Sequence, residues 1–299
     1  MGLHDGMTVS FLFLAIADFN FAVVSLALGV SGYVYVYEVQ YGYWFPVEPY
    51  GVGLFFANLL VPLSAVVAVN TSFIAVVRCI CVSLPLYFKH AFRRETTVML
   101  MSGFFLVITA VDIPVFVYMG MVDKFDLAHN RSRPSLWVSS SRENVKDIVW
   151  SLIAMAVPFA TQIITIGSII IMARALKNAQ RFRMASANGE LNYRTKLVEK
   201  PGTKDKFSLK SSGKLSGRDR QIVKQIVVIS LVYILCNTPK IMFILAGVVV
   251  PEFALGSPLN FLYLTVSNIR MIFEVINSTI NLPIYYRYNS KFRSVCRIW

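Results

Sequence analysis

The chain has 299 residues, of which 56% are apolar and only 15% are charged, so its composition differs from that of a soluble globular protein. Its formal net charge is +13, but the basic residues gather in alternate segments between apolar runs, which indicates membrane topology and makes nucleic acid an unexpected partner. The sequence shows no metal-ligand cluster, nucleophile constellation or phosphate-binding loop, so we do not expect an enzyme.

The apolar residues form long continuous runs, in chain order 8–30, 52–77, 96–122, 148–173, 226–250 and 253–286. Each run reaches the roughly 20 residues that a helix needs to cross a bilayer. Strands of a membrane barrel would instead alternate apolar and polar residues over about ten positions, and these runs do not alternate. The sequence therefore predicts an all-α membrane protein with six spans.

The segments between the runs indicate which side of the membrane each one faces. Most Lys and Arg residues lie in 83–95, in 174–225 and after residue 286, and the positive-inside rule places these segments in the cytosol. With an even number of spans, both chain ends are then cytosolic. Within the second segment, 180–220 is rich in Lys, Arg, Ser and Gly, so we expect a flexible cytosolic loop there.

Two residues are candidates for covalent modification. Asn130 opens an Asn-Arg-Ser sequon in a segment predicted to face outside, and it is either glycosylated or an unused match to a short pattern. Cys296 lies in the basic tail, where it is either S-palmitoylated or a plain thiol. No cysteine lies in a predicted outside segment, so we expect no extracellular disulfide.

Charged residues inside the runs are costly in hydrocarbon and usually face a bundle interior, so each is a candidate functional residue. They are Asp18, Arg78, Asp112, Lys240, Arg270 and Glu274. Arg270 and Glu274 are four positions apart, so they share one helix face and either pair for a functional purpose or simply neutralise each other. Lys240 directly follows Pro239 and lies too deep in its run to reach the membrane surface.

Several short motifs follow one another along the chain. They are LAIAD ending at Asp18, VVRCICVSLPL around Arg78, AMAVPFA around Pro158, CNTP at 236–239, NSTINLPIYY at 277–286 and NSKFR at 289–293. Together they resemble the rhodopsin-like (class A) G-protein-coupled receptor family. The residues around two of the motifs, GLHDGMTVSFLFLAIADF and VVISLVYILCNTPK, are similar to the molluscan chemosensory receptor subfamily. The resemblance implies one receptor domain over 1–299, a seven-helix bundle without its first helix, and a membrane-surface helix at 289–299.

The sequence departs from this family's pattern at three places. Residues 1–7 stand where the family has its first inside loop, Gly53 replaces a usual cysteine, and Val77 replaces an acidic residue before Arg78. The chain is then either a fragment or a diverged, non-signalling receptor, and we favour the fragment because a missing wall would expose Asp18 to lipid. A six-span transporter or channel is a more distant alternative, disfavoured by the lack of an inverted repeat or filter-like loop.

The resemblance implies signalling by outward movement of 226–250, the family's sixth helix, which opens a cytosolic site for a heterotrimeric G protein. The residues that would carry this movement are Arg78, Asp219, Pro239, Asn281, Pro283 and Tyr285. Asp219 matches one of the family's partners for the arginine, so we expect an Arg78–Asp219 pair that latches the inactive state.

The resemblance also implies an allosteric Na⁺ ion, and we expect no other cofactor. Asp18, Asn277 and Asn281 would supply its oxygen ligands. Val67 stands where many relatives have a serine, so one hydroxyl ligand of the usual set is absent.

The extracellular ligand would meet the outer halves of the last two runs. The candidate ligand-binding residues are Asn237, Lys240, Arg270 and Glu274, with Asp112 as a further candidate. Leu60 stands at the family's amine-binding position, which disfavours a monoamine. Lys240 and Arg270 against Glu274 leave one positive charge in excess, so we expect a small molecule with a carboxylate or amide; a neuropeptide with an amidated end is the alternative.

Overall fold

The computed structural model describes residues 6–83, 94–126, 130–198, 217–254 and 256–288, and most of them are helical. The helices are α1 (Gly6–Tyr41), α2 (Pro49–Ser83), α4 (Arg94–Val117), α5 (Arg142–Trp150), α6 (Val157–Val198), α7 (Gly217–Val249) and α8 (Asn260–Tyr288). A π-helical segment, η1 (Ser151–Ala156), joins α5 to α6. Two antiparallel strands, β1 (Met119–Asp126) and β2 (Arg131–Val138), form a hairpin.

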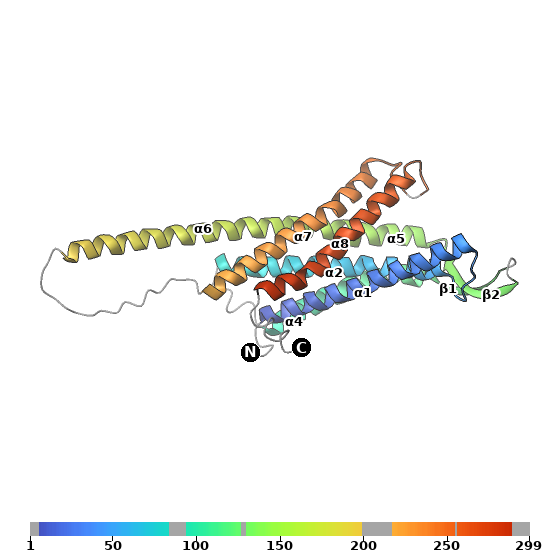
Figure 1. The fold of residues 1–299 in the computed structure, drawn as a ribbon, viewed down its shortest axis with the longest axis horizontal. Helices are drawn as coiled ribbons and strands as arrows, with labels where there is room; N and C mark the ends of the chain where they lie inside the picture. Colours follow the sequence, from blue (N-terminus) through green and yellow to red (C-terminus); the bar gives the residue numbers. More distant parts are fainter. Residues whose placement is uncertain (1–5, 84–93, 127–129, 199–216, 255, 289–299) are drawn as a thin grey trace.

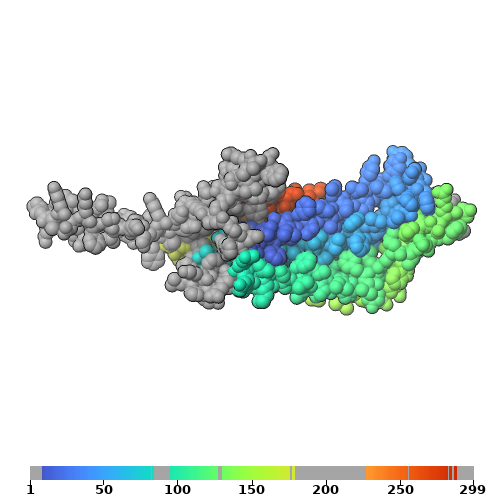
Figure 2. All heavy atoms as spheres, turned by 90° about the horizontal axis from the view of Figure 1, so that it is seen from below, coloured from blue at the N-terminus to red at the C-terminus, as the bar shows by residue number. Residues whose placement is uncertain are grey.

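The long helices lie lengthwise against one another, and the hairpin caps one end of the bundle (Figure 1). Helix α1 begins and α8 ends toward the opposite end, beyond which α6 projects far past its neighbours (Figure 1). Helix α1 packs on α2, α4 and α8, while α7 contacts α6, α8 and α2. Figure 2 shows α1 and α4 side by side along one face, with the hairpin beyond them.

Five of the described helical stretches are long and apolar enough to cross a membrane. They are Val9–Tyr41, Pro49–Cys81, Arg94–Val117, Arg142–Ala175 and Val227–Val249. Helix α8 is not among them because Arg270, Glu274, Asn277 and Asn281 make it more polar, although it packs in the same bundle against α1 and α7. The molecule is therefore a multi-pass α-helical membrane protein.

The ends of several helices differ from the predicted ranges. Helix α1 continues to Tyr41 instead of stopping at residue 30, so much of the tyrosine-rich segment after the first run is helical. Helix α4 ends at Val117 because the residues that follow pair as β1, with Met119 opposite Val138. The last helix begins at Asn260, seven positions later than predicted.

The flexible loop predicted over 180–220 is shorter in the structure, because α6 remains helical through Val198 and α7 begins at Gly217. Good helix formers such as Ala, Lys, Arg, Gln and Met fill much of this part of α6. The 42 residues of α6 extend about 60 Å at about 1.5 Å per residue, roughly twice the hydrocarbon thickness of a bilayer. The charged composition thus marks a helix that leaves the membrane, rather than an irregular loop.

The main apolar core lies where α1, α2, α4 and the α5–η1 segment meet. Its largest buried members include Leu14, Phe21, Leu60, Val66, Met101, Val115 and Ile153. Many large apolar residues instead face outward, as the surface of a protein in hydrocarbon requires; Phe19, Leu26, Ile163 and Phe261 are examples.

The hairpin is fixed to the α1–α2 end of the bundle by polar contacts. Arg133 forms an ion pair with Glu38, and its guanidinium lies 5.9 Å from the ring centroid of Trp44. The backbone N–H of Leu136 donates to Glu48 Oε2 at 2.5 Å. The described cysteines are all free thiols, so these contacts hold the hairpin in the described part of the chain without a disulfide.

Helix α2 and the hairpin approach closely at Gly51. A Cβ atom at this position would lie 2.9 Å from the sulfur of Met121 and 3.1 Å from Cβ of Leu136. The absence of a side chain therefore sets how tightly the hairpin seats on α2.

Candidate functional site

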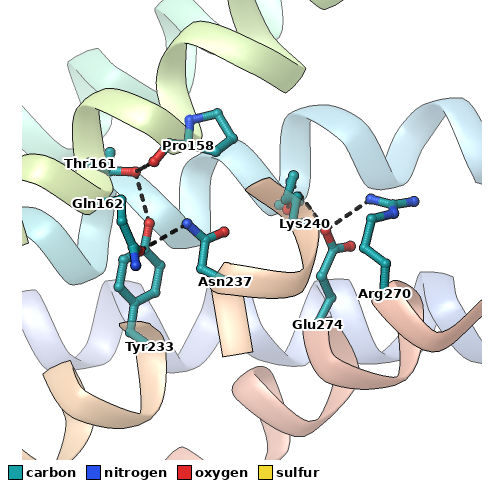
Figure 3. Close-up of polar contacts among 9 residues, drawn as sticks. Pro158, Thr161, Gln162, Tyr233, Asn237, Lys240, Arg270 and Glu274 are labelled. Atoms are coloured by element: carbon teal, nitrogen blue, oxygen red, sulfur yellow. Dashed lines mark hydrogen bonds and ion pairs between the residues drawn. The ribbon is translucent and has the colours of Figure 1, made fainter. Parts of the chain in front are cut away.

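Three polar residues of α7 share the face that points into the bundle. Tyr233, Asn237 and Lys240 are spaced by four and three positions, so they lie one above the other on the helix. All three are buried, and Pro239 lies beside the uppermost one. Figure 3 shows that each of these side chains reaches a neighbouring helix.

The lowest contact joins α7 to α6 and, through it, to α2. The Thr161 hydroxyl donates to the carbonyl of Val157 at 2.8 Å, which leaves the Tyr233 hydroxyl to donate to Thr161 at 2.7 Å. The carbonyl of Thr161 also accepts from the Ser72 hydroxyl at 2.9 Å, and Ser72 lies 2.8 Å from the Thr165 hydroxyl. Three helices are thus tied by one chain of buried hydrogen bonds.

The next contact lies one turn higher. The Asn237 side-chain amide donates to Gln162 Oε1 at 3.1 Å (Figure 3). The amide nitrogen of Gln162 donates to the carbonyl of Ile234 at 3.4 Å. We call the Tyr233–Thr161 and Asn237–Gln162 contacts together the α6–α7 tie. It holds the middle of α7 against α6.

The uppermost contact is a cluster of three charges, which we call the charge triad: Lys240, which is buried, and Glu274 and Arg270, which are partly buried. Lys240 Nζ lies 3.1 Å and Arg270 Nη1 lies 3.0 Å from the same oxygen, Glu274 Oε1 (Figure 3). Lys240 also donates to the Ser64 hydroxyl at 2.7 Å, which connects the triad to α2. The Arg270 guanidinium lies 5.4 Å from the ring centroid of Phe243 on α7.

A small cavity lies between the triad and the lower part of α8. Its volume is about 20 Å³, and its polar lining comes from Ser64, Tyr233, Asn237, Glu274, Asn277 and Ser278. A cavity of this size holds about one water molecule. The helices therefore leave little space beside Glu274 on the side of this cavity.

A further buried contact joins α8 to α1. The side-chain amide of Asn281 donates to Asp18 Oδ2 at 2.7 Å, whereas Asp18 Oδ1 is buried without a hydrogen-bond partner among the described residues. Asp18 and Asn281 line a groove of about 300 Å³ between the two helices together with Ser278.

This donor set can be compared with the expected Na⁺ site. The orphaned oxygen of Asp18 suits a hard cation, which prefers oxygen ligands. Asn277, however, lines the small cavity beside Glu274 and not the Asp18 groove, and Val67 offers no side-chain oxygen. The residues thus fit a cation at Asp18 with Ser278 and Asn281, and Asn277 is not part of that set.

Asp112 is not brought to the other predicted ligand-binding residues. It is buried on α4, which packs on α1, α2 and α5, whereas the triad belongs to α7 and α8. Neither of its carboxylate oxygens has a hydrogen-bond partner among the described residues. The prediction that Asp112 joins Lys240 and Glu274 is corrected, because depth in the membrane does not determine which helices are neighbours.

The remaining predicted residues lie elsewhere. Arg78 is buried near the end of α2, but the side chains of Asp219 and Tyr285 fall outside the described residues, so the predicted latch stays a prediction. Cys296 also lies outside them. Asn130 is exposed at the turn between the strands with φ at 50°, a conformation that asparagine tolerates.

Sequence reasoning missed most of the polar residues that link α7 to α6 and α2. They are Ser64, Ser72, Thr161, Gln162, Thr165 and Tyr233. The available signal was the recurrence of hydroxyl and amide side chains at helical spacing on 161–165, just after Pro158. Such residues are common in membrane helices, where they bond across helix interfaces, so single matches carry little information.

Comparisons with known proteins agree with this architecture. A family model described as 7 transmembrane receptor (rhodopsin family) matches residues 2–286. The chain belongs to the rhodopsin family of seven-transmembrane receptors. The crystal structure of squid rhodopsin is similar to it with a TM-score of 0.58 and 14% identity, over 97% of this chain and 70% of that chain. No curated protein matches the chain by sequence.

The family membership confirms the predicted fold class, and the helix count fits a partial bundle of this receptor family. In this receptor, α7 corresponds to the run that carries CNTP, and α8 to the run that carries NSTINLPIYY. The triad therefore joins the two helices whose motifs led to most of the predicted ligand and activation residues, and the α6–α7 tie shares one of them, α7.

Proposed function

We propose that this receptor passes the binding of an extracellular ligand to a cytosolic heterotrimeric G protein through outward movement of α7. The observation that carries the proposal is the single inward face of α7, on which Tyr233, Asn237 and Lys240 bond to different neighbours. A helix held by a few discrete polar contacts can exchange one set of partners for another, which is how bistable elements amplify small changes. Asn237, Lys240, Arg270 and Glu274 form the proposed ligand site.

A ligand shifts an equilibrium only by binding one state better than the other. Here a polar ligand group that engages the triad would change the contacts of Lys240 with Ser64 and Glu274, and thereby the position of the upper part of α7. Pro239 lies next to Lys240 inside α7, where it removes one backbone hydrogen bond and lets the two halves of the helix bend. The α6–α7 tie must then break for the lower half to move.

The cytosolic half would contain the remaining switch elements. In the inactive state we expect the Arg78–Asp219 latch between α2 and α7, and a Na⁺ ion on Asp18 Oδ1 beside Ser278 and Asn281. On activation, Tyr285 would turn inward at the Pro283 distortion of α8. The hydrogen bond from Asn281 to Asp18 supports a polar switch at this depth, because neither group can be left unpaired cheaply in hydrocarbon.

We propose that the hairpin lies outside the cell and both chain ends lie in the cytosol, with the receptor in the plasma membrane; the basic residues of alternate segments support this orientation. Asn130, exposed at the hairpin turn, would then carry a glycan, and Cys296 in the basic tail would carry a palmitoyl chain. A peptide N-glycosidase digestion that lowers the mass of the wild type but not of Asn130→Gln tests the orientation.

We propose a chemosensory role with a small polar ligand. A neuropeptide ligand is the second candidate, favoured by clustered aromatic rings at the end of α1 and just after it. The ring centroids of the exposed Tyr37 and Tyr41 are 4.7 Å apart, and those of the exposed Tyr43 and the half-buried Phe45 are 4.9 Å apart. Clustered tyrosine rings are frequent in protein and peptide interfaces.

Basal G-protein activation tests the proposed function directly. Thr161→Val combined with Tyr233→Phe removes the lower bond of the α6–α7 tie. We expect the double variant to cause more ligand-independent G-protein dissociation than the wild type. The assay uses cells that each express a single Gα class. Thr238→Val is the matched control, because the exposed Thr238 hydroxyl bonds only to the carbonyl of Ile234 on its own helix, at 2.7 Å. Equal basal activity of wild type and double variant with every Gα class would contradict the proposal.

A further inference from the structure

The charge triad carries one positive charge more than its partners neutralise. Lys240 and Arg270 both contact Glu274 Oε1, so two cations share one oxygen of one carboxylate. Among the described residues, the charged groups that interact with Glu274 are these two cations. Glu274 is the acidic group that interacts with Lys240. The excess lies in the membrane-spanning part of the bundle, where an unpaired charge is expensive.

The triad also presents an unused donor. Arg270 Nε is buried and has no hydrogen-bond partner among the described residues, while Nη1 of the same guanidinium is bound to Glu274. A guanidinium offers its donors in a fixed plane and binds anionic groups at adjacent nitrogens. An anion bound at Arg270 Nε would both accept a hydrogen bond from this unpaired donor and neutralise the excess positive charge of the triad.

Arg270 is the most exposed member of the triad. Its side chain is 23% exposed, against 7% for Lys240, so it is the member of the triad nearest to the outside of the protein. One face of its guanidinium is covered by Phe243, which itself packs against Phe253 and Tyr263 with ring centroids 5.5 and 5.1 Å away. These rings would fix the guanidinium and exclude water from one side of a bound anion.

We propose that the triad is completed by one bound anion, held at Arg270 through Nε and balanced by the second cation, Lys240. The anion is a halide or a carboxylate, either as a free ion or as the acidic group of the receptor's ligand. The proposed anion site consists of residues of the proposed ligand site, so its role in signalling rests on the proposed receptor function. Binding of the anion itself depends only on the charge and donors of the triad.

The test is thermal unfolding of the purified full-length chain in nanodiscs of neutral lipid. Sodium methanesulfonate, which is neither a halide nor a carboxylate, is compared with sodium chloride and sodium acetate at one pH, ionic strength and sodium concentration, so that a cation at Asp18 contributes equally. Chloride or acetate should raise the unfolding temperature with a saturable dependence on concentration. A rise with acetate alone indicates the acidic group of a ligand, and a rise with chloride indicates a resident inorganic ion.

Variants separate this site from general salt effects. Arg270→Gln should abolish the saturable rise, and Arg270→Lys, which keeps the charge but lacks the planar donors, should weaken apparent anion affinity about tenfold. Lys146→Gln, which removes a positive charge from α5 where Lys146 pairs with Glu143, should leave the rise unchanged.

Two results overturn the proposal. One is an unfolding temperature that is the same in all three salts, as expected if Lys240 is neutral and the triad needs no further anion. The other is an equal rise in wild type and Arg270→Lys. Neither result depends on G-protein activation, so a negative result here does not contradict the proposed signalling function. A failure of the signalling proposal likewise does not contradict anion binding at the triad.

Discussion

Asn281 on α8 and Asp18 on α1 form a buried hydrogen bond of 2.7 Å across the bundle. The bond satisfies one oxygen of the carboxylate, and the other has no partner among the described residues. This asymmetry gives the pair two possible states, because the free oxygen can accept a cation or a second donor without breaking the existing bond. A buried polar pair of this kind stabilises the bundle and can also switch.

Asn281→Ala should lower the free energy of unfolding by about 2 kcal/mol, because it removes an interhelical hydrogen bond to a buried carboxylate. Chemical denaturation of the purified chain in detergent measures the change. Thr279→Ala is the control, since the exposed Thr279 hydroxyl bonds to the carbonyl of Val275 on its own helix. Equal stability of the two variants would show that the interhelical bond contributes little.

Glu274→Gln should destabilise the receptor by about 3–5 kcal/mol, the range found when one partner of a buried ion pair is removed. The loss arises because Lys240 and Arg270 then face each other without their shared carboxylate. Adding Lys240→Met to this variant should restore part of the stability, because one uncompensated cation is removed. A double variant less stable than Glu274→Gln would argue against charge balance as the cause.

The Glu38–Arg133 ion pair should protect the hairpin from proteolysis. Glu38→Gln weakens a partly buried pair that joins α1 to β2, so we expect faster tryptic cleavage at Lys124 and Arg131, followed by gel electrophoresis. Glu143→Gln breaks the ion pair with Lys146 within α5 and is the matched control. If both variants are cleaved at the wild-type rate, the remaining contacts at Trp44 and Glu48 suffice to hold the hairpin.

Gly51→Ala should lower the unfolding temperature, whereas Gly53→Ala should not. The added methyl group at Gly51 would lie 2.9 Å from the Met121 sulfur and 3.1 Å from Leu136 Cβ, while at Gly53 the nearest atom, Ser31 Cβ, is 3.6 Å away. Overpacking of this kind typically costs about 1–3 kcal/mol. A differential scanning measurement on both variants checks the contrast, and similar unfolding temperatures would mean that the hairpin shifts freely.

The sequence was most informative where a feature depends on spacing within one helix. The Arg270–Glu274 pair follows from positions four apart, and the structure contains it. Lys240 joins this pair only because α7 packs on α8, which spacing along the chain does not reveal. The same reason explains Asp112, which matches the others in polarity and depth but lies on a helix with different neighbours.

Composition was misleading where the same polar residues suit both a loop and a regular element outside the membrane. The basic residues of 180–220 were predicted to form a flexible loop, but helix formers carry α6 to Val198, because a helix that leaves the membrane needs a polar surface. The segment after Val117 was read as the end of a span and a loop, but it forms a hairpin whose partner strand begins only at Arg131. Strand pairing between such short, mixed segments leaves little periodicity to detect.

The most direct measurement of α7 movement is the distance between the C-terminal end of α2 and the N-terminal part of α7, which we propose face the cytosol, by double electron–electron resonance. Spin labels on noncanonical amino acids at Ser83 and Gln225 leave the native cysteines in place. Thr161→Val with Tyr233→Phe should shift the population toward longer distances, and Thr238→Val should give the wild-type distribution. If the distribution of the double variant is identical to that of the wild type, the α6–α7 tie does not hold α7 in place, and the proposed switch is wrong.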